Sequence, residues 1–400
     1  MREVVIVTAK RTPIGRHRGV LKDVRPDDLA ALVLKTVIND IGLDPVQVDD
    51  VLLGAANQAG EDNRNVARMA LLLAGFPVTV PGATMNRLCG SSLEAVNRGY
   101  QAIYSGEADI IIAGGVESMT RAPFVLPKPD TGFANGNREL YDTTIGWRMI
   151  NPRMQAQYYP YSMGETAENL AEKFHIGRQA QDAWAFDSHR KAVAAQNEGL
   201  FDDEIIPVPV ENPKTHEITQ VTRDEHPRAD TSLEKLARLN PAFRQEGTVT
   251  AGNSSGINDG AAAVVLMEAH EAQRRNLEPL AYIRGTGVAG VDPAIMGYGP
   301  VPATQKALSR HGWKLDEIEE VELNEAFAAQ VLAVLHDLPF APEIVNRQGG
   351  AIALGHPLGA SGARILTTLL HGMKRHGSKK GVATMCIGVG QGITTLVERP

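Results

Sequence analysis

Cysteine is nearly absent from the sequence: only Cys89 and Cys386 occur among 400 residues. One pair cannot form a disulfide scaffold in a chain of this length, so we expect a reducing compartment, the cytoplasm. Residues 1–7 combine an acidic residue with a short apolar run, unlike a signal peptide. No uninterrupted apolar stretch of the sequence reaches the roughly 18–20 residues of a membrane span, which argues against a membrane protein.

Positive charge is not concentrated anywhere in the sequence. Lysine and arginine total 40 against 47 aspartate and glutamate residues, for a net charge of −7. No basic block is long enough to bind a phosphate-rich polymer or an anionic membrane, so nucleic acid is not an expected partner. Histidine and cysteine do not cluster at metal-ligand spacing either, and we expect no metal.

The chain is longer than one ordinary domain, since single hydrophobic cores stop growing at roughly 250–300 residues. Hydrophobic residues make up 43% and charged residues 22%, which excludes a largely disordered chain. Strand–helix alternation predicts an α/β fold with mostly parallel sheets. Short apolar runs predict buried strands at 4–7, 51–53, 110–113, 263–267, 321–323 and 382–386. Helical spacing of apolar residues predicts helices at 27–40, 93–105, 303–310, 325–336 and 361–375.

The middle of the chain, about 121–249, is richer in proline, tyrosine, aspartate and arginine, and its strand signals are weak. Helical stretches at 164–174 and 179–197 suggest an inserted, loop-rich subdomain, because a structureless loop of this length is uncommon in a compact domain. The outer segments are similar in size. Each has a glycine-flanked reactive residue before a helix, Cys89 or His356. We therefore predict three segments, 1–120, 121–249 and 250–400, with a duplicated core.

Cys89 stands directly before a predicted helix, among small residues. The unpaired N–H groups and the dipole of a helix N-terminus stabilise a thiolate, so the pKa of Cys89 is expected below the free value of about 8.5. Ser91 or Ser92 could cap the helix. The alternative is that Cys89 is a small, well-packed hydrophobe. This segment alone leaves nucleophile and core residue equally open.

Three further segments favour chemistry. His356 lies in a glycine-rich turn with a proline after it, a rigid setting that suits a base. Cys386 ends a predicted strand and is followed by alternating glycines, whose N–H groups could face a ligand as an oxyanion hole requires. Asn324 closes the predicted strand 321–323, and strand C-terminal ends are where open α/β sheets bind ligands.

Together these segments resemble the thiolase family, coenzyme A-dependent enzymes that make or cleave 3-ketoacyl thioesters. The resemblance covers essentially the whole chain and rests on motifs in a fixed order. They are Arg11 to Gly15, Cys89-Gly90-Ser91, Ala113 to Met119, Gly252 to Ala261, Asn324-Glu325-Ala326-Phe327, Gly355-His356-Pro357 and Cys386-Ile387-Gly388. The family fold it implies is a duplicated core of mixed five-stranded sheets, with helices between and outside them, plus an inserted loop subdomain.

The resemblance also implies a role for each matching residue. Cys89 would be the nucleophile that carries the acyl group as a thioester, and His356 would take its proton. Cys386 would be the acid/base at the α-carbon of acetyl-CoA. Asn324 would hold a water that, with His356, binds the thioester oxygen of the second substrate. The N–H groups of Cys89 and Gly388 would form the oxyanion hole of the acyl-enzyme.

The implied reaction is a ping-pong acyl transfer that cleaves 3-ketoacyl-CoA or condenses two acetyl-CoA, as in fatty acid metabolism. Coenzyme A thioesters are then substrates, and no prosthetic group is needed. For coenzyme A binding, the resemblance points to Arg228 at a phosphate, to Phe243, Met163 and Phe327 along the pantetheine channel, and to Ala251 and Ser255 at the pantetheine amides. Arg228 could equally be a solvated charge, Met163 and Phe327 core residues, and Glu325 a helix-start carboxylate. Thiolases assemble as dimers, often paired into tetramers, so a homotetramer is expected.

Two departures bear on the substrate. The chain reads Tyr161-Ser162-Met163-Gly164 where many short-chain biosynthetic thiolases have histidine before the Met-Gly pair, and a second serine follows Ser91 where glycine is frequent. Residues 60–69 and 142–148 instead resemble the 3-oxoadipyl-CoA thiolase branch, whose substrate carries a carboxylate. Arg64, Arg68 or Arg148 could pair with that group, or could tie loops together at a subunit interface.

Two other classes remain as alternatives. A decarboxylating ketoacyl synthase shares the duplicated core and an active cysteine, but it lacks the second catalytic cysteine, so Cys386 argues against it. A non-catalytic CoA- or lipid-binding relative would keep the channel and lose the thiols, whereas this sequence keeps Cys89, His356 and Cys386.

Overall fold

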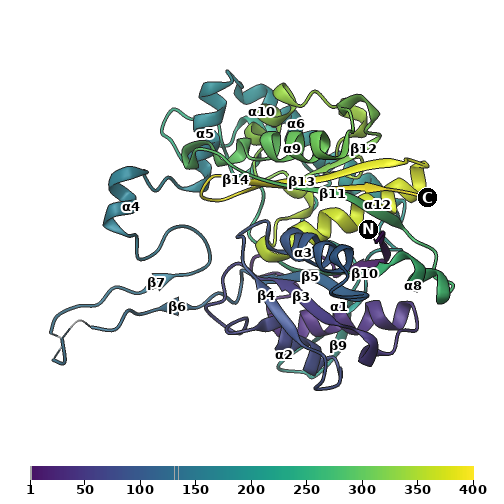
Figure 1. The fold of residues 1–400 in the computed structure, drawn as a ribbon. Coiled ribbons are helices and arrows are strands. Elements are labelled where there is room, and N and C mark those ends of the chain that lie inside the picture. Colours follow the sequence, from purple (N-terminus) through teal and green to yellow (C-terminus); the bar gives the residue numbers. More distant parts are fainter. Residues whose placement is uncertain (1, 130, 134) are drawn as a thin grey trace.

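The computed structural model describes residues 2–129, 131–133 and 135–400. It has one large mixed sheet in which two halves repeat the same strand order (Figure 1). The first half orders its strands β4-β3-β5-β10-β1 and the second β12-β13-β14-β11. The strands of the first half are β1 Val4–Arg11, β3 Asp50–Gly54, β4 Gly82–Met85, β5 Ile110–Ser118 and β10 Asn258–Glu268. Those of the second half are β11 Ala281–Gly290, β12 Glu320–Leu323, β13 Lys380–Ile387 and β14 Gln391–Glu398.

The pairing directions of the two halves match strand for strand. β3 is parallel to β5 as β12 is to β13, and the remaining pairs along each half, apart from β3–β4, are antiparallel. A parallel bridge between Val321 and Val345 stands where the first half has β4. The duplicated core is therefore confirmed, with the fifth strand of the second half reduced to a bridge. The halves join at β1–β11 through the pairs Val5–Tyr282 and Ile6–Ala281.

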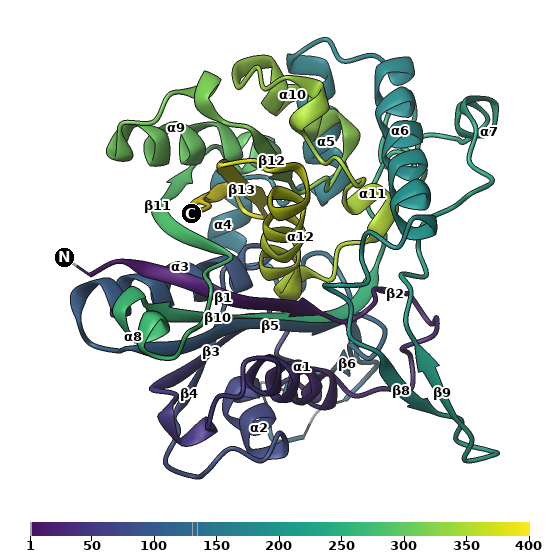
Figure 2. The same cartoon turned by 90° about the vertical axis from the view of Figure 1, so that its right-hand side faces the viewer.

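Twelve helices are described, and several of them form layers on the sheet, whereas α4 lies away from it (Figure 1). They are α1 Pro26–Asp40, α2 Val66–Leu73, α3 Ser91–Ser105, α4 Pro152–Gln157, α5 Met163–Lys173, α6 Arg178–Asn197, α7 Leu233–Ala237, α8 Ala269–Arg274, α9 Pro300–His311, α10 Ala328–Asp337, α11 Ala351–Leu354 and α12 Ser361–His376. Helices α3 and α12 lie between the two halves of the sheet (Figures 1 and 2). The buried residues of α3 and α12 share one core with strands of both halves.

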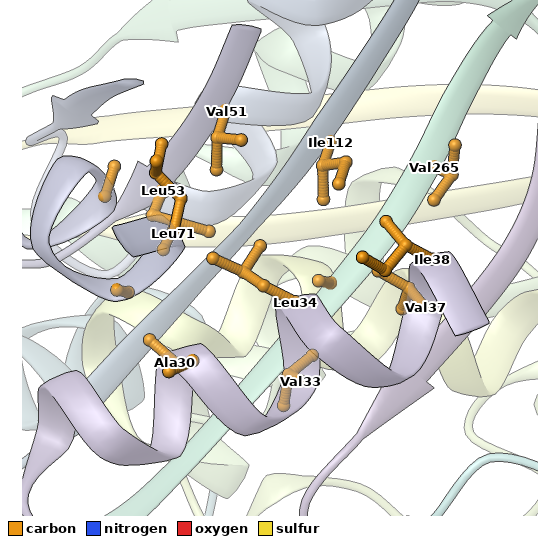
Figure 3. Packing of buried hydrophobic residues seen from close by; sticks show 14 of the residues in the cluster. Ala30, Val33, Leu34, Val37, Ile38, Val51, Leu53, Leu71, Ile112 and Val265 are labelled. Atoms are coloured by element: carbon orange, nitrogen blue, oxygen red, sulfur yellow. The ribbon is translucent and has the colours of Figure 1, made fainter. Parts of the chain in front are cut away.

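The outer helices cover the far faces. Leu34, Val37 and Ile38 of α1 pack on Ile112 of β5 and Val265 of β10 (Figure 3). On the second half, α9 and α10 form the equivalent cluster. Burying a side chain of this size stabilises the fold by about 1.5–3 kcal/mol. Glycine permits the closest approach in the centre, since a Cβ on Gly362 of α12 would lie 2.5 Å from the backbone of Leu93 in α3.

The segment between β5 and β10 leaves the sheet. It contains two small antiparallel pairs, β6 Phe124–Val125 with β7 Tyr141–Asp142 and β8 Val208–Glu211 with β9 Ile218–Val221. Outside this segment, the short strand β2 Gly15–Arg16 pairs with β10. The β6–β7 arm projects from the body in Figure 1 and the β8–β9 pair in Figure 2. The boundaries at 120 and 249 stay a prediction, and β10, from the third predicted segment, lies inside the first half of the sheet.

All predicted strands and helices are present, but the expectation of mostly parallel sheets was wrong. Helix crossovers make β3, β4 and β5 parallel, and likewise β12 and β13, whereas the last strand of each half runs antiparallel to its neighbours. In the second half this follows from the tight β13–β14 hairpin, which can join only antiparallel strands. No helix among the described residues has the length and apolarity to cross a membrane.

Candidate active site

A cavity of about 630 Å³ brings together residues from both halves and from the inserted segment. Cys89, His356 and Cys386 all line it, although they are up to 297 positions apart in sequence (386 − 89). All six residues predicted to bind coenzyme A line the same cavity. They are Met163, Arg228, Phe243, Ala251, Ser255 and Phe327. Asn324 and Gly388 do not contribute to its wall.

Cys89 is held by a tight turn directly before α3. Leu88 has a φ of 47°, a left-handed conformation that is uncommon outside glycine. Gly90 follows, and a Cβ there would lie 2.6 Å from Ile387 of β13. The missing side chain therefore lets the turn approach the strand that carries Cys386.

The expected low pKa of Cys89 was wrong. Burial raises the pKa of this thiol to about 11, while hydrogen bonds from the N–H groups of Gly388 and of Cys89 itself oppose the rise. The helix N-terminus is present, but taking the charged sulfur out of water outweighs it. Cys386 behaves in the same way: burial raises its pKa most, and the nearby Cys89 adds to the increase. The cavity therefore holds two neutral thiols.

One hydrogen bond holds the ring of His356, and another holds its backbone. Its Nδ1 lies 2.6 Å from Ser361 Oγ, and its amide N–H donates to Asn258 Oδ1 at 2.9 Å. Its Nε2 has no hydrogen-bond partner within the described part of the chain. Burial, and secondarily the charge of Arg364, lowers the pKa of His356 to about 3, so the imidazole is neutral.

Asn324 and Glu325 follow β12 and have different surroundings. Asn324 is fully buried, with Nδ2 3.5 Å from Nδ1 of His356 and an Oδ1 that lacks a partner among the described residues. Glu325 accepts hydrogen bonds from Trp184 Nε1, Ser188 Oγ, Asn346 Nδ2 and the N–H of Ile352, at 2.7–3.1 Å. These hydrogen bonds join Glu325 to α6, α11 and the loop at Asn346. Because α10 begins only at Ala328, Glu325 does not act as a helix-start carboxylate.

Gly388 begins the hairpin between β13 and β14. Val389 and Gly390 have φ of 62° and 79°, and positive φ is rare for a β-branched residue such as Val389. This turn directs the N–H of Gly388 to the sulfur of Cys89. A Cβ on Gly388 would lie 3.3 Å from Leu88 and 3.5 Å from the sulfur of Met163, so the position is close to the cavity wall.

The channel residues pack on each other. The rings of Phe243 and Phe327 meet edge to face with centroids 6.1 Å apart. Gly164, next to Met163, leaves room for Phe243, because a Cβ there would lie 2.1 Å from the ring. The N–H of Ser255 donates to the carbonyl of Ala326 at 2.9 Å, which fixes the 251–256 loop against the start of the segment before α10.

Three residues with basic side chains in the cavity wall were not predicted: His189, His226 and Lys235. Burial is the main cause that lowers the pKa of each histidine to about 4. The amide of exposed Arg228 donates to His189 Nδ1 at 3.2 Å, and Lys235 pairs with Asp230 at 2.7 Å. No sequence motif pointed to these residues. His189 lies in the middle of α6, His226 in a loop and Lys235 in α7.

The three arginines considered for a substrate carboxylate lie outside the cavity wall. Arg68 donates to the carbonyls of Val78 and Val80, so it ties a loop to α2. Arg64 is exposed. Arg148 is half-buried and donates to Asn57 Oδ1 at 3.1 Å, two positions after Gly146, which does line the cavity. No group of three or more histidine, cysteine, aspartate or glutamate residues in the described ranges could hold a metal ion.

Comparison with known proteins identifies the family of the chain. Residues 4–270 match the family model of the thiolase N-terminal domain, and residues 277–399 match that of the thiolase C-terminal domain. A Pseudomonas putida protein named beta-ketoadipyl-CoA thiolase is 53% identical over 402 residues, covering 100% of both chains. A Chromobacterium violaceum protein named acetyl-CoA acetyltransferase is 50% identical over 398 residues, also covering 100% of both. The crystal structure of Bacillus anthracis acetyl-CoA acetyltransferase superposes with a TM-score of 0.94 at 43% identity, covering 100% of this chain and 99% of that chain.

The fold and the relatives define an acyltransferase that acts on coenzyme A thioesters. The chain belongs to the thiolase family. The family, the fold class and the thiolase activity predicted from the sequence are thereby confirmed.

Proposed function

We propose that Cys89, His356 and Cys386 carry the thiolase reaction, with Cys89 as the nucleophile. The observation that carries this proposal is their meeting in one cavity, next to the N–H of Gly388. In the cleavage direction, His356 takes the proton of Cys89, whose sulfur then attacks the 3-keto carbon of the substrate. The carbon–carbon bond breaks, and Cys386 gives its proton to the α-carbon of the departing acetyl-CoA. Cys386, now a thiolate, then takes the proton of coenzyme A, whose sulfur attacks the acyl-cysteine. A shortened acyl-CoA is released, and the departing sulfur of Cys89 recovers its proton from His356.

Two sets of neutral donors would stabilise the charge that develops on oxygen. The N–H groups of Cys89 and Gly388 already point at the reacting sulfur, which supports their role as the oxyanion hole of the acyl-enzyme. Asn324 and His356 would serve the thioester oxygen of acetyl-CoA, Asn324 through a water. Their partnerless Oδ1 and Nε2 support this role. Losing one such donor typically costs about 10²–10³ in rate.

Coenzyme A would lie along the wall formed by the inserted segment. Phe243, Phe327 and Met163 supply an apolar passage for pantetheine, and Ala251 and Ser255 lie beside it. Arg228, with no carboxylate within ion-pair distance among the described residues, would meet a phosphate. The reaction as written needs no prosthetic group.

The test of the catalytic roles is mass spectrometry after brief exposure to acetyl-CoA. We expect one acetyl adduct on Cys89, removed by adding coenzyme A. Cys89→Ala should take up no label, and Cys386→Ala should be acetylated but fail to exchange the α-protons of acetyl-CoA. An equal acetyl label on Cys89→Ala would refute the nucleophile assignment.

We propose 3-oxoadipyl-CoA as the preferred substrate. The name of the Pseudomonas putida relative supports it, as does the position of Arg148 two residues after the cavity wall. A charge-assisted hydrogen bond to a carboxylate contributes about 1.5–3 kcal/mol, so Arg148→Gln should lower kcat/KM for 3-oxoadipyl-CoA about 10- to 100-fold. Acetoacetyl-CoA, which lacks the carboxylate, should be unaffected.

Arg64→Gln is the comparison variant, since Arg64 is exposed and does not line the cavity. If the selective loss follows Arg64 instead, the assignment of Arg148 fails. A panel of 3-ketoacyl-CoA chain lengths completes the test. A wild-type enzyme that prefers acetoacetyl-CoA or long monocarboxylic chains would contradict the dicarboxylic substrate.

We also propose a homotetramer. The β6–β7 arm and the segment after it expose large apolar side chains, which soluble proteins usually cover with a partner. They are Phe124, Leu126, Phe133, Leu140, Ile145, Met149, Tyr158 and Tyr159. Ultracentrifugation should find a tetramer, and Phe133→Asp should lower the order of assembly. A wild-type monomer would contradict this. The need for two reduced thiols supports a reducing compartment such as the cytoplasm.

A further inference from the structure

The imidazole of His356 has two ring nitrogens in unlike surroundings. Nδ1 faces the hydroxyl of Ser361 at 2.6 Å and, more distantly, the amide Nδ2 of Asn324 at 3.5 Å, whereas Nε2 has no partner among the described residues. Both His356 and Ser361 are buried. Which nitrogen carries the proton of the neutral ring decides whether the imidazole can accept a proton from Cys89.

Counting protons at Ser361 favours a proton on Nδ1, and the opposing donor, Nδ2 of Asn324, lies 3.5 Å from Nδ1, at the outer limit of a hydrogen bond. Its Oγ lies 2.9 Å from the carbonyl oxygen of Pro357, which can only accept a hydrogen bond. When the single hydroxyl proton goes there, Oγ is left to accept from Nδ1–H of His356. In the opposite arrangement the hydroxyl donates to Nδ1 and the ring proton sits on Nε2. It would then be a buried donor without an acceptor, an arrangement that folded proteins rarely leave uncompensated.

We propose that Ser361 is a positioning residue that keeps the ring proton of His356 on Nδ1 and so leaves the Nε2 lone pair free for the proton of Cys89. This rests on the proposed role of His356 as the base. In the step itself, the S–H bond of Cys89 breaks and an N–H bond forms at Nε2. The ring becomes positively charged, and its Nδ1–H still donates to Ser361. The new Nε2–H is then available to the thioester oxygen of the substrate.

The surroundings fix Ser361 relative to the nucleophile. Ser361 starts α12, and two positions further the N–H of Ala363 donates to Ser92 Oγ at 2.9 Å in the first turn of α3. Ser92 lies three positions after Cys89. The helix that carries the hydroxyl and the helix that follows the thiol are therefore joined by a direct hydrogen bond.

The test must distinguish the proposed arrangement from the opposite one, in which the hydroxyl of Ser361 donates to Nδ1 and the ring proton sits on Nε2. The carbonyl of Pro357 also accepts the N–H groups of Ala360 and Ser361, both at 3.0 Å, which crowds that oxygen. Neutron diffraction of the full-length wild-type enzyme in D₂O at neutral pH locates the protons directly. We expect deuterium on Nδ1, none on Nε2, and the Ser361 deuteron toward Pro357. Deuterium on Nε2, with the hydroxyl directed at Nδ1, would overturn the proposal without any variant.

Kinetics give the second readout. In Ser361→Ala the ring loses its acceptor, and single-turnover acetylation of Cys89 by acetyl-CoA at neutral pH should fall about 10- to 100-fold, part of what a general base contributes. The difference in acetylation rate between Ser361→Ala and the wild type should shrink as the pH rises toward the pKa of Cys89, because solvent then removes the thiol proton. Ser361→Thr keeps a hydroxyl and should restore most of the rate. Acetylation that is unchanged in Ser361→Ala, or equally slow at every pH, would contradict a tautomer role.

Two controls separate the possible failures. Thr367→Val removes a hydroxyl that is also buried in α12, donates to the carbonyl of Ala363 at 2.8 Å, and has no contact with the imidazole. It should acetylate at the wild-type rate, and a loss equal to that of Ser361→Ala would reduce Ser361 to a structural role. His356→Asn tests the base itself: wild-type acetylation there would refute the proposed function, whatever Ser361 does.

Discussion

A single added methyl group at Gly164 should narrow the proposed coenzyme A channel and leave the chemistry intact. A Cβ at this position would lie 2.1–2.3 Å from three ring atoms of Phe243. Atoms cannot approach so closely, and a ring is rigid, so Phe243 must turn away from its contact with Phe327. The helix cannot easily yield instead, because Ser162 and Glu165 form a capping box at the start of α5.

The magnitude follows from the contact that is lost. An edge-to-face aromatic pair is worth about 0.5–1.5 kcal/mol beyond burial, and Phe243 is already 39% exposed, so its displacement removes only part of its burial. A loss of about 1 kcal/mol in the channel raises the KM for acetyl-CoA about fivefold. The rate constant kcat should stay within about twofold, since neither Cys89 nor His356 moves. Steady-state kinetics of Gly164→Ala measure both.

Gly177→Ala is the matched control. Gly177 also stands at the start of a helix, α6, but a Cβ there meets nothing within 4 Å. The KM of Gly177→Ala for acetyl-CoA should equal that of the wild type. If Gly164→Ala kept the wild-type KM, or lost kcat while KM stayed constant, the assignment of Phe243 to the channel wall would be wrong.

Two further predictions follow from charge and burial. Because burial raises the pKa of Cys89 to about 11, its alkylation by iodoacetamide should accelerate without a plateau between pH 6 and about 10, and a plateau near pH 8 would contradict this pKa. The raised pKa favours the protonated thiol in the folded state, so the stability due to Cys89 is present below about pH 9 and lost as the pH rises through 11. Arg11 is fully buried between Glu204 and Asp224, and Arg11→Leu should lower the free energy of unfolding by about 3–5 kcal/mol in urea titrations. Arg25→Leu, at a pair that is half exposed, should cost at most about 1 kcal/mol, and equal losses would refute the reasoning.

The sequence predicts well those elements whose apolar residues repeat at a regular spacing. α1 and α12 begin and end within one residue of the expected ranges. β11 gave no such signal, because glycines replace apolar residues where helix α9 packs. A Cβ on Gly287 would lie 2.2 Å from the carbonyl of Ala303, and one on Gly285 would meet His311. Close packing removes the side chains that a pattern search depends on.

The site was predicted from short motifs, and its gaps have a physical cause. Cys89, His356 and Cys386 each lie beside glycines that a tight turn requires, so their positions leave a local signature. His189 and His226 have none, since only the folding of the inserted segment brings α6 and its loop to the channel. The pKa of Cys89 was wrong for a related reason. The helix terminus is visible in the sequence, whereas the burial that opposes it is a property of the assembled fold.

If Cys89 is the nucleophile and His356 its base, as proposed, the surroundings of both determine how Cys89 is activated. Burial raises the pKa of Cys89 to about 11 and lowers that of His356 to about 3, so a resting thiolate–imidazolium pair is strongly disfavoured. The proton must therefore move only when a substrate carbonyl can take up the negative charge. At that moment the N–H groups at Gly388 and Cys89 would stabilise the oxyanion in the proposed mechanism, and the oxygen of Ser361 would stabilise the imidazolium through Nδ1–H. In the proposed mechanism, a neutral pair with charge-stabilising groups on both sides would protect an idle thiol from alkylation and oxidation while keeping the barrier for acyl transfer low.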